Sequence, residues 1–299
     1  MTSVYLTFFT SYTTYLFRHK YLILYLKNLS CFDAGTAANY EYRATKTYFI
    51  ISAASFISFF LDVTSFIVDD LFDALIAIER IQYNFTIHGV YVISLEFIIC
   101  AEMITKRFQY LQERKLSPLS RIKKNVHLLE AVRSLNRYHD VPLLAMSGLT
   151  FFFSISQLNL IVTACILDID DFSFDLFVIT DIMRLVPCWI VFGVTALEAR
   201  LLSTEAERFQ QSLYDTVLND STNYYIDHPL VRIHMVFWEP VKINAANFFN
   251  VDLTLLCTML GGACSYFIIL VQYLIIKTPE IISFYHGNEL TMDGELMDD

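Results

Sequence analysis

Charged residues are scarce in this sequence, and basic residues are the scarcer of the two kinds. Asp, Glu, Lys and Arg make up 17% of the 299 residues, whereas 55% are hydrophobic. Soluble domains carry about 25% charged residues, so this composition indicates a membrane protein. With 21 basic against 31 acidic residues the net charge is −10, which argues against a nucleic-acid partner.

Signatures of catalysis and of metal binding are also missing. The six cysteines lie mostly in apolar runs without paired spacing, which favours buried thiols over a disulfide or zinc framework. No HExxH, GxSxG or glycine-rich phosphate loop accompanies the pairs His127/Glu130 and His139/Asp140. The acidic stretch 168–171 lacks the Gly and the distant Glu of a calcium loop, so a solvated turn is favoured. We therefore expect no enzyme activity, no bound metal and no cofactor.

Long apolar runs are what the sequence has in abundance. A helix that crosses a bilayer needs roughly 20 predominantly apolar residues. The segments that meet this length are 47–68, 85–104, 141–167, 177–197 and 253–276. Pro187 predicts a kink in the fourth of them, and the aromatic stretch 4–17 is too short to be assigned as a span. The expected fold class is all-α, a polytopic membrane helical bundle.

The distribution of charge gives these spans an orientation. The basic stretches are 18–46 and 106–137, and the acidic stretches are 69–79, 168–175 and the tail 277–299. Because loops rich in Lys and Arg stay in the cytoplasm, we expect the acidic stretches and the C-terminus to be extracellular. The sequon Asn84-Phe85-Thr86 then falls outside the cell, which makes Asn84 a candidate glycosylation site.

The last span carries an unusual polar pattern. Ser265-Tyr266 is followed by five apolar residues and then by Gln272-Tyr273. A Gln is costly against lipid, so Gln272 should face protein or water. The pattern resembles the signature of insect gustatory receptors, a Thr-Tyr, five apolar residues and Gln-Phe in the last membrane helix. Here Ser265 replaces the Thr and Tyr273 replaces the Phe, and the preceding stretch 246–253 resembles the short aromatic approach to that helix.

The resemblance extends along the chain. Segment 21–44 resembles the first cytoplasmic loop, 128–144 the approach to the fifth helix, 198–228 the third cytoplasmic loop, and 230–249 the cytoplasmic half of the seventh helix. Counting back from the last helix leaves none for the first, so we expect this sequence to lack the first helix. The expected division is a transmembrane ligand-binding bundle with cytoplasmic helical extensions over 1–249, a pore-lining final helix over 250–276 and an acidic extracellular tail over 277–299.

The resemblance also implies a function. It implies a ligand-gated, nonselective cation channel with inverted seven-transmembrane topology in the plasma membrane of a sensory neuron. The channel would detect a small-molecule tastant as a homo- or hetero-tetramer with other gustatory receptors. The matching positions imply that Gln272 and Ile269, one turn earlier, line the pore, with Ile269 as an apolar constriction. Two alternatives stay open: Gln272 could bond a neighbouring helix, and Gly261, Gly262 and Ala263 could serve close approach within one subunit rather than at the pore axis.

The ligand pocket is expected in the outer half of the bundle, among the helices before the seventh. Pockets combine apolar walls with a few polar anchors, and the candidates at suitable depth are His88, Tyr91, Gln157, Asp181 and Arg184. A position at the membrane interface or a local ion pair is the simpler explanation for each. Asp181 and Arg184, for example, stand at the i,i+3 spacing that allows pairing within one helix.

Other membrane proteins were weighed against this hypothesis. An odorant receptor of the same superfamily shares the fold, but its last helix usually lacks the Tyr-to-Gln spacing. A transporter would show internal repeats with broken helices, and the sequence has no such repeat. A G-protein-coupled receptor would need the opposite topology, and the sequence contains neither an Asp-Arg-Tyr after a third span nor an Asn-Pro in the last one.

Overall fold

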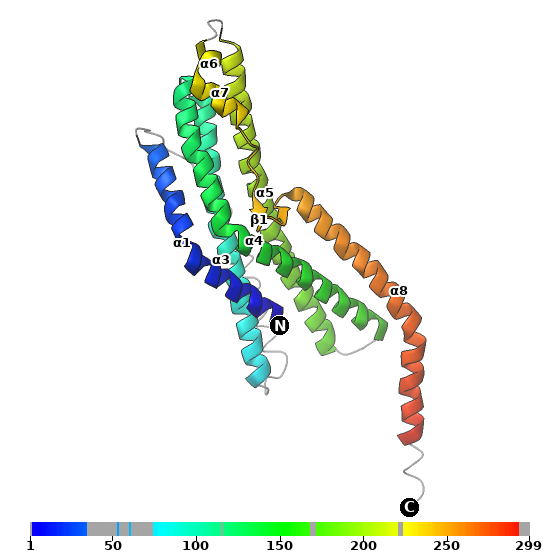
Figure 1. Cartoon of the computed structure of the whole chain (residues 1–299). Helices are drawn as coiled ribbons and strands as arrows, with labels where there is room; N and C mark the ends of the chain where they lie inside the picture. The colour runs from blue at the N-terminus through cyan, green and yellow to red at the C-terminus, as the bar shows by residue number, and fades with distance from the viewer. Residues whose placement is uncertain are drawn as a thin grey trace, which may run out of the picture.

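The computed structural model describes residues 2–34, 53, 60, 74–114, 116–167, 172–220 and 224–292. Its elements are, in order, α1 (Thr2–Asp33), α3 (Ala74–Glu113), α4 (Pro118–Leu167), α5 (Phe172–Leu218), α6 (Tyr224–Asp227), α7 (Pro229–Val236), β1 (Asn244–Ala245), β2 (Phe249–Asn250) and α8 (Leu253–Met292). Figure 1 shows α3, α4 and α5 running together toward the end that carries α6 and α7. The predicted span 47–68 and the acidic stretch 168–171 lie almost entirely outside the described residues.

Three of the described helices are long and apolar enough to cross a membrane. The segments are Pro118–Asn159, Leu185–Leu218 and Leu253–Tyr273, and they overlap three of the predicted spans. Helices α4 and α5 have 50 and 47 residues, so at 1.5 Å per residue they are about 75 and 70 Å long. Since the hydrocarbon core of a bilayer is only about 30 Å thick, each helix must extend well beyond it. The predicted all-α helical bundle with extensions beyond the membrane is therefore what the chain forms.

Two helices begin or end where the sequence did not suggest it. The stretch 4–17 and the basic residues after it form one continuous helix, α1. Conversely, the expected helix over 230–249 stops early, because α7 ends at Val236. Pro240 disfavours helical backbone at Glu239, and the chain turns instead through a short β hairpin.

This hairpin forms a hydrogen-bonded and largely buried connection between α7 and α8. β1 pairs antiparallel to β2, with Asn244 opposite Asn250, and the N–H of Val251 donates to the carbonyl of Ile243 at 2.8 Å. The turn places Ala246 and Asn247 in the left-handed region, with φ of 49° and 62°. The side chains of Val241, Ile243, Ala245 and Val251 are buried, so the hairpin is anchored to the bundle just before α8 begins.

Basic residues of the predicted cytoplasmic stretches hold the ends of helices together. Arg107 on α3 is 5% exposed and binds the Asp33 carboxylate at the end of α1 through two bonds, of 2.5 and 3.1 Å. Lys124 on α4 donates to the Phe32 carbonyl at 3.3 Å. Arg121 reaches the hydroxyl of Ser212 on α5 at 3.0 Å. These charges, which served only to predict the topology, therefore also bind protein groups.

Removing the Asp33 carboxylate should destabilise the bundle. Asp33→Ala removes the ion pair that the carboxylate forms with the buried Arg107 guanidinium, and breaking a buried pair costs about 3–5 kcal/mol. Because the Asp33 side chain is 35% exposed, we expect a smaller loss of about 2 kcal/mol, or a decrease of about 4–8 °C in melting temperature. The measurement is thermal denaturation of the detergent-solubilised chain. Glu130→Ala, which breaks the exposed Glu130–Arg133 pair, is the control and should shift the melting temperature far less.

Candidate functional site

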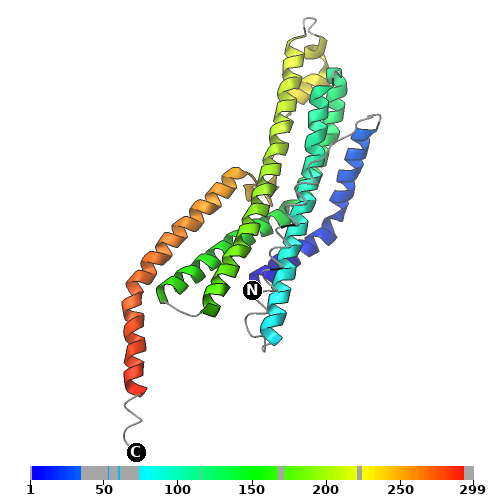
Figure 2. The ribbon, with the colours of Figure 1, turned by 180° about the vertical axis from the view of Figure 1, so that it is seen from behind.

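Helix α8 is much more exposed than the other membrane-length helices. Only 11% of its apolar segment is buried, against 44% and 50% for the segments in α4 and α5. Figures 1 and 2 show α8 leaving the bundle near the hairpin and running free toward the C-terminus. Its buried side carries Met259 and Ala263, and a Cβ added at Gly262 would lie 3.5 Å from the Phe151 ring on α4.

The opposite side of α8 carries a stripe of mostly small and polar residues, with one large apolar residue, Ile269, among them. Thr258, Gly261, Ser265, Ile269 and Gln272 recur at three- and four-residue spacing, so they share one helix face, and all are exposed. We call this set the α8 stripe. The hydroxyls of Thr258 and Ser265 donate to backbone carbonyls one turn earlier, at 2.8 and 2.9 Å. Gln272 has no hydrogen-bond partner among the described residues.

The family-motif residues therefore lie on the exposed part of α8. Tyr266 and Tyr273 are 36% and 58% exposed, and Ile269 is 64% exposed. The three small residues before the motif divide between the two sides: Gly262 faces α4, whereas a Cβ at Gly261 would meet nothing within 4 Å. Gly262 thus lies beside α4 at a distance where a Cβ would make an ordinary van der Waals contact, and Gly261 lies on the open face.

The described candidates for the ligand pocket lie on different helices and do not contact one another. Tyr91 on α3 is buried, with its hydroxyl 3.4 Å from the Cys188 sulfur on α5. Gln157 on α4 is 7% exposed, and its buried Oε1 accepts no hydrogen bond from the described residues. Beside it in sequence, Ser154 accepts a bond of 2.9 Å from the Trp189 indole. A buried amide oxygen without a donor is costly. This distinguishes Gln157 from Tyr91, the other described candidate for the ligand pocket.

The side chains of the other predicted site residues lie outside the described part of the structure, although the helices that carry them are described. His88 and Asn84 lie within α3, and Asp181 and Arg184 lie within α5. The sequon is therefore about three turns into a helix rather than in a loop. The positions of these four side chains stay predictions.

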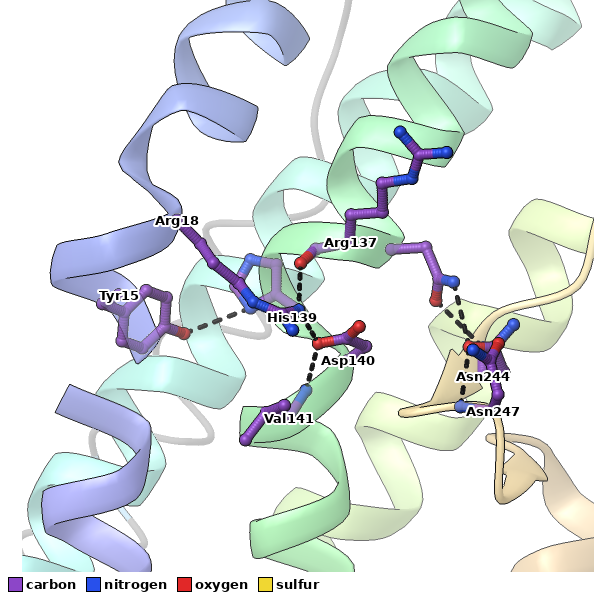
Figure 3. A network of polar contacts seen from close by, with 9 residues as sticks. Tyr15, Arg18, Arg137, His139, Asp140, Val141, Asn244 and Asn247 are labelled. Atoms are coloured by element: carbon purple, nitrogen blue, oxygen red, sulfur yellow. Dashed lines mark hydrogen bonds and ion pairs between the residues drawn. The ribbon is translucent and has the colours of Figure 1, made fainter. Parts of the chain in front are cut away.

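A polar cluster surrounds Pro142, a proline inside α4. Arg18 of α1 forms an ion pair with Asp140 and donates to the Arg137 carbonyl at 2.6 Å. One turn earlier on α1, the Tyr15 hydroxyl lies 3.1 Å from Nδ1 of the fully buried His139. Figure 3 shows Tyr15 and Arg18 reaching from α1 to this part of α4, and the direction of α4 changes near its middle (Figure 1). We refer to Tyr15, Arg18, Arg137, His139 and Asp140 as the kink cluster.

Next to the kink cluster, α4 is tied to the hairpin that precedes α8. The Asn136 amide donates to the Asn244 side-chain oxygen at 3.1 Å, and the Asn244 backbone N–H donates back to the Asn136 oxygen at 2.9 Å. The Asn244 oxygen also accepts from the Asn247 N–H at 3.4 Å. This reciprocal pair joins residues 108 positions apart in sequence. Dashed lines mark the contacts of Asn244 in Figure 3.

A groove of about 410 Å³ lies beside this pair, between α4 and the segment from α7 to β1. Its lining includes Val132 and Arg133 of α4 and Phe237, Trp238 and Lys242 of the connecting segment. His234, also in the lining, hydrogen-bonds the Gln210 side-chain oxygen of α5 at 3.0 Å. Burial lowers the pKa of His234 from its ordinary value of 6.5, so the imidazole is neutral at pH 7.

Acidification should weaken the attachment of α7. A histidine whose pKa is lower in the folded than in the unfolded state stabilises the fold fully above about pH 6.5, and that stabilisation falls as the pH drops further. We expect the melting temperature of the chain to decrease more between pH 7 and pH 5.5 than that of His234→Gln, which cannot take up the proton. Thermal denaturation at the two pH values measures this difference. An equal decrease in melting temperature for the wild-type chain and for His234→Gln would contradict this role of His234.

Sequence reasoning missed the contacts that connect α1, α4 and the hairpin. Arg18 counted only as a basic residue for topology, and Asn136 appeared only within a family-like stretch. The available signal was local: Asp140 precedes Pro142 by two residues in a long helix, and freed backbone groups at a proline need new partners. The identity of those partners, more than 100 residues away, had no local signal.

Comparisons with known proteins give the chain its family. The family model described as "7tm Chemosensory receptor" matches residues 1–276. Over 220 residues the chain is 26% identical to a Drosophila melanogaster protein provisionally named gustatory receptor 28a. The match covers 69% of this chain and 48% of that protein, so the chain spans about half the length of this curated relative.

Solved structures share the fold. The insect olfactory receptor OR5 from Machilis hrabei aligns with a TM-score of 0.66 and 15% identity, covering 91% of this chain and 79% of that one. The same receptor in complex with eugenol aligns with a TM-score of 0.59 and 15% identity, covering 91% and 80%. Because the family model matches nearly the whole length, the chain belongs to the 7tm chemosensory receptor family of polytopic membrane proteins.

Proposed function

We propose that this chain is a gustatory receptor subunit, a ligand-gated nonselective cation channel that detects a tastant at the plasma membrane of a sensory neuron. Family membership and the gustatory relative support this assignment. So does the Tyr266-to-Gln272 spacing, which resembles the gustatory signature. The proposed orientation keeps the basic stretches in the cytoplasm and the C-terminus outside the cell.

The observation that carries the proposal is the α8 stripe. An apolar helix of membrane length that exposes Gln272 on an unpartnered face is costly in lipid, whereas the same face is favourable against a water-filled pore. Four copies of α8 around an axis would place a ring of Ile269 side chains beside a ring of Gln272 side chains. A ring of apolar side chains can close a pore by dewetting, and ligand binding would then shift the population toward a state with a wider ring.

Helix α7 supports assembly into a tetramer with identical or related subunits. Leu230, Ile233, Val236 and Phe237 recur along its outer side and are 41%, 58%, 75% and 76% exposed. Exposed apolar patches of this kind mark interaction sites. In the proposed orientation this segment lies on the cytoplasmic side, so another protein surface is a better partner for it than lipid. Association there would bring the neighbouring α8 helices toward a common axis.

The ligand proposed for the outer bundle is a small molecule with a hydroxyl or amine donor. Gln157 offers a buried amide oxygen that no described group satisfies, and Tyr91 is buried on α3 with its hydroxyl beside Cys188. Machilis hrabei OR5 forms a complex with eugenol, which makes small phenols one class to test beside sugars and bitter compounds. His88, Asp181 and Arg184 remain proposed members of the same pocket.

Two measurements test the proposed function: the side of the membrane on which the C-terminus lies, and the current that a ligand evokes. The chain is expressed in cells with a C-terminal epitope, and antibody access to intact cells is measured beside whole-cell current under a tastant panel. An accessible epitope and a ligand-evoked cation current are the expected results. An epitope reached only after permeabilisation would overturn the topology and the channel with it. A surface-expressed chain that conducts only with a second receptor subunit would show that the channel is a heteromer.

An odorant receptor is the second candidate, because the solved neighbours are olfactory receptors. Because gustatory and odorant receptors share the fold, the class of ligand that evokes a response distinguishes the two functions. Responses confined to volatile ligands would favour the odorant receptor, and responses to dissolved, nonvolatile tastants would favour the gustatory one.

A further inference from the structure

We propose that Arg18 is a positioning residue for gating, which holds the bend of α4 at the angle that presents Asn136 to the hairpin before α8. The part that concerns gating rests on the proposed channel function. The part that concerns geometry does not, and it follows from the contacts of the kink cluster.

The first step is the set of backbone groups around Pro142. Proline has no N–H to donate, and its ring displaces the carbonyl four residues earlier, so a helix bends there. At this bend the Val141 N–H donates to the Asp140 carboxylate at 2.5 Å. The Arg137 carbonyl, four residues before Val141, accepts from Arg18 at 2.6 Å. Groups that would normally bond along α4 are therefore held by side chains.

The second step is that one guanidinium binds on both sides of the same turn. Arg18 bonds the Arg137 carbonyl and the Asp140 carboxylate, so it holds the turn that leads into Pro142, and a change in the shape of this turn would alter these contacts. The Arg18 and Asp140 side chains are 31% and 17% exposed, which limits screening by water. Tyr15, three residues earlier on α1, adds the contact to His139. Two contacts on one face of α1 fix its register against α4.

The third step connects the bend to α8. Asn136 immediately precedes Arg137, and its reciprocal amide pair with Asn244 holds the start of β1. From there the hairpin closes through the bond from Val251 to Ile243, and the Asp252 carboxylate caps the first turn of α8 by accepting from the Leu255 N–H at 2.9 Å. A contiguous set of bonds thus runs from α1 to the base of the proposed pore helix. Coupling between sites requires such physical contacts, and mutation tests whether they carry it.

Hydrogen exchange of the purified full chain tests the geometry without any ligand. For Arg18→Gln we expect exchange to be faster by about threefold or more, both in 137–146 and in 244–256, because local opening sets exchange rates. Arg18→Lys, which keeps the charge and a donor, should largely restore the wild-type rates. The matched control is Arg133→Gln, since Arg133 lies on the same helix and its ion pair in the described part of the chain is with Glu130, within its own helix. Unchanged exchange in 244–256 for Arg18→Gln would overturn the proposal.

A second variant keeps the test decisive if Arg18→Gln does not fold. Asn136→Leu removes the link to the hairpin and leaves the kink cluster in place. It should speed exchange in 244–256 and leave 137–146 unchanged, and the reverse pattern would contradict the proposed order of contacts.

Current recordings then test the consequence for gating. Arg18→Gln should raise the half-maximal ligand concentration by about threefold or more, a typical allosteric coupling, with unchanged permeability ratios. A purely structural role would lower surface expression and leave the concentration dependence of the remaining current as in wild type. If the surface-expressed wild-type chain carries no ligand-evoked current, the channel function fails, whereas the exchange pattern still decides the geometric part.

Discussion

Ile269→Asn is expected to produce a channel that conducts without ligand. Ile269 is 64% exposed on the unpartnered side of α8, and a ring of such side chains would hold the closed pore dry. Replacing the ring by amides lets water enter, so we expect the ligand-free current per surface receptor to rise by about tenfold or more, which corresponds to only ~1.4 kcal/mol in the closed-to-open equilibrium. The measurement is whole-cell current before and during ligand application.

The control for this substitution is Leu260, an aliphatic residue on the other side of α8. Leu260 is 44% exposed, and it lies nine residues before Ile269, about 180° around the helix and off the α8 stripe. Leu260→Asn introduces the same polar group into the same helix and should leave the ligand-free current low. Equal leak in both variants would indicate a general disturbance of α8 rather than a constriction at Ile269.

Gln272→Ala is expected to change which ions pass, with little change in ligand sensitivity. The Gln272 amide has no partner among the described residues, and a polar side chain in a pore wall replaces part of an ion's hydration shell. We expect the ratio of divalent to monovalent permeability to shift by about twofold or more, with the half-maximal ligand concentration within about twofold of wild type. Reversal potentials in solutions of different ions give the ratio.

A charged variant makes the same test sharper. Gln272→Glu would place a ring of carboxylates in a tetramer, and rings of acidic side chains favour cations. Its permeability to divalent cations should move in the opposite direction to that of the alanine variant. If both variants keep wild-type reversal potentials, Gln272 faces lipid or a neighbouring helix instead of the pore.

The helices were predictable because apolar runs of membrane length leave the chain few alternatives. Segments 141–167 and 177–197 were found by composition alone, and the structure places them in α4 and α5. Composition gave no measure of how far these helices extend, because amphipathic turns outside the apolar segments continue them without a break. The joining of 4–17 to the basic residues after it in α1 was predicted only in part, since helix was expected to continue over 21–27. Arg18 looked like the end of a segment, whereas its charge is satisfied by Asp140 of another helix.

The candidate site was predictable only where one helix contains it. The face that joins Ile269 to Gln272 follows from helical spacing, so the sequence placed it correctly on the final helix. Whether that face is open depends on what the rest of the bundle covers, and this became visible only with Met259 and Ala263 buried on the other side. The pair Asn136–Asn244 depends on where two distant segments meet, and spacing within either segment carries no information about it.

The turn before α8 offers a route to a receptor better suited to imaging. Ala246 has φ of 49°, a conformation that costs an L-residue about 1 kcal/mol and costs glycine almost nothing. Ala246→Gly should therefore raise the melting temperature of the solubilised chain by about 2–4 °C, as thermal denaturation would show, whereas an unchanged or lower value would mean that the turn is relaxed as it stands. The substitution alters neither the kink cluster nor the α8 stripe. A sample that survives purification longer would thus retain the groups proposed to move.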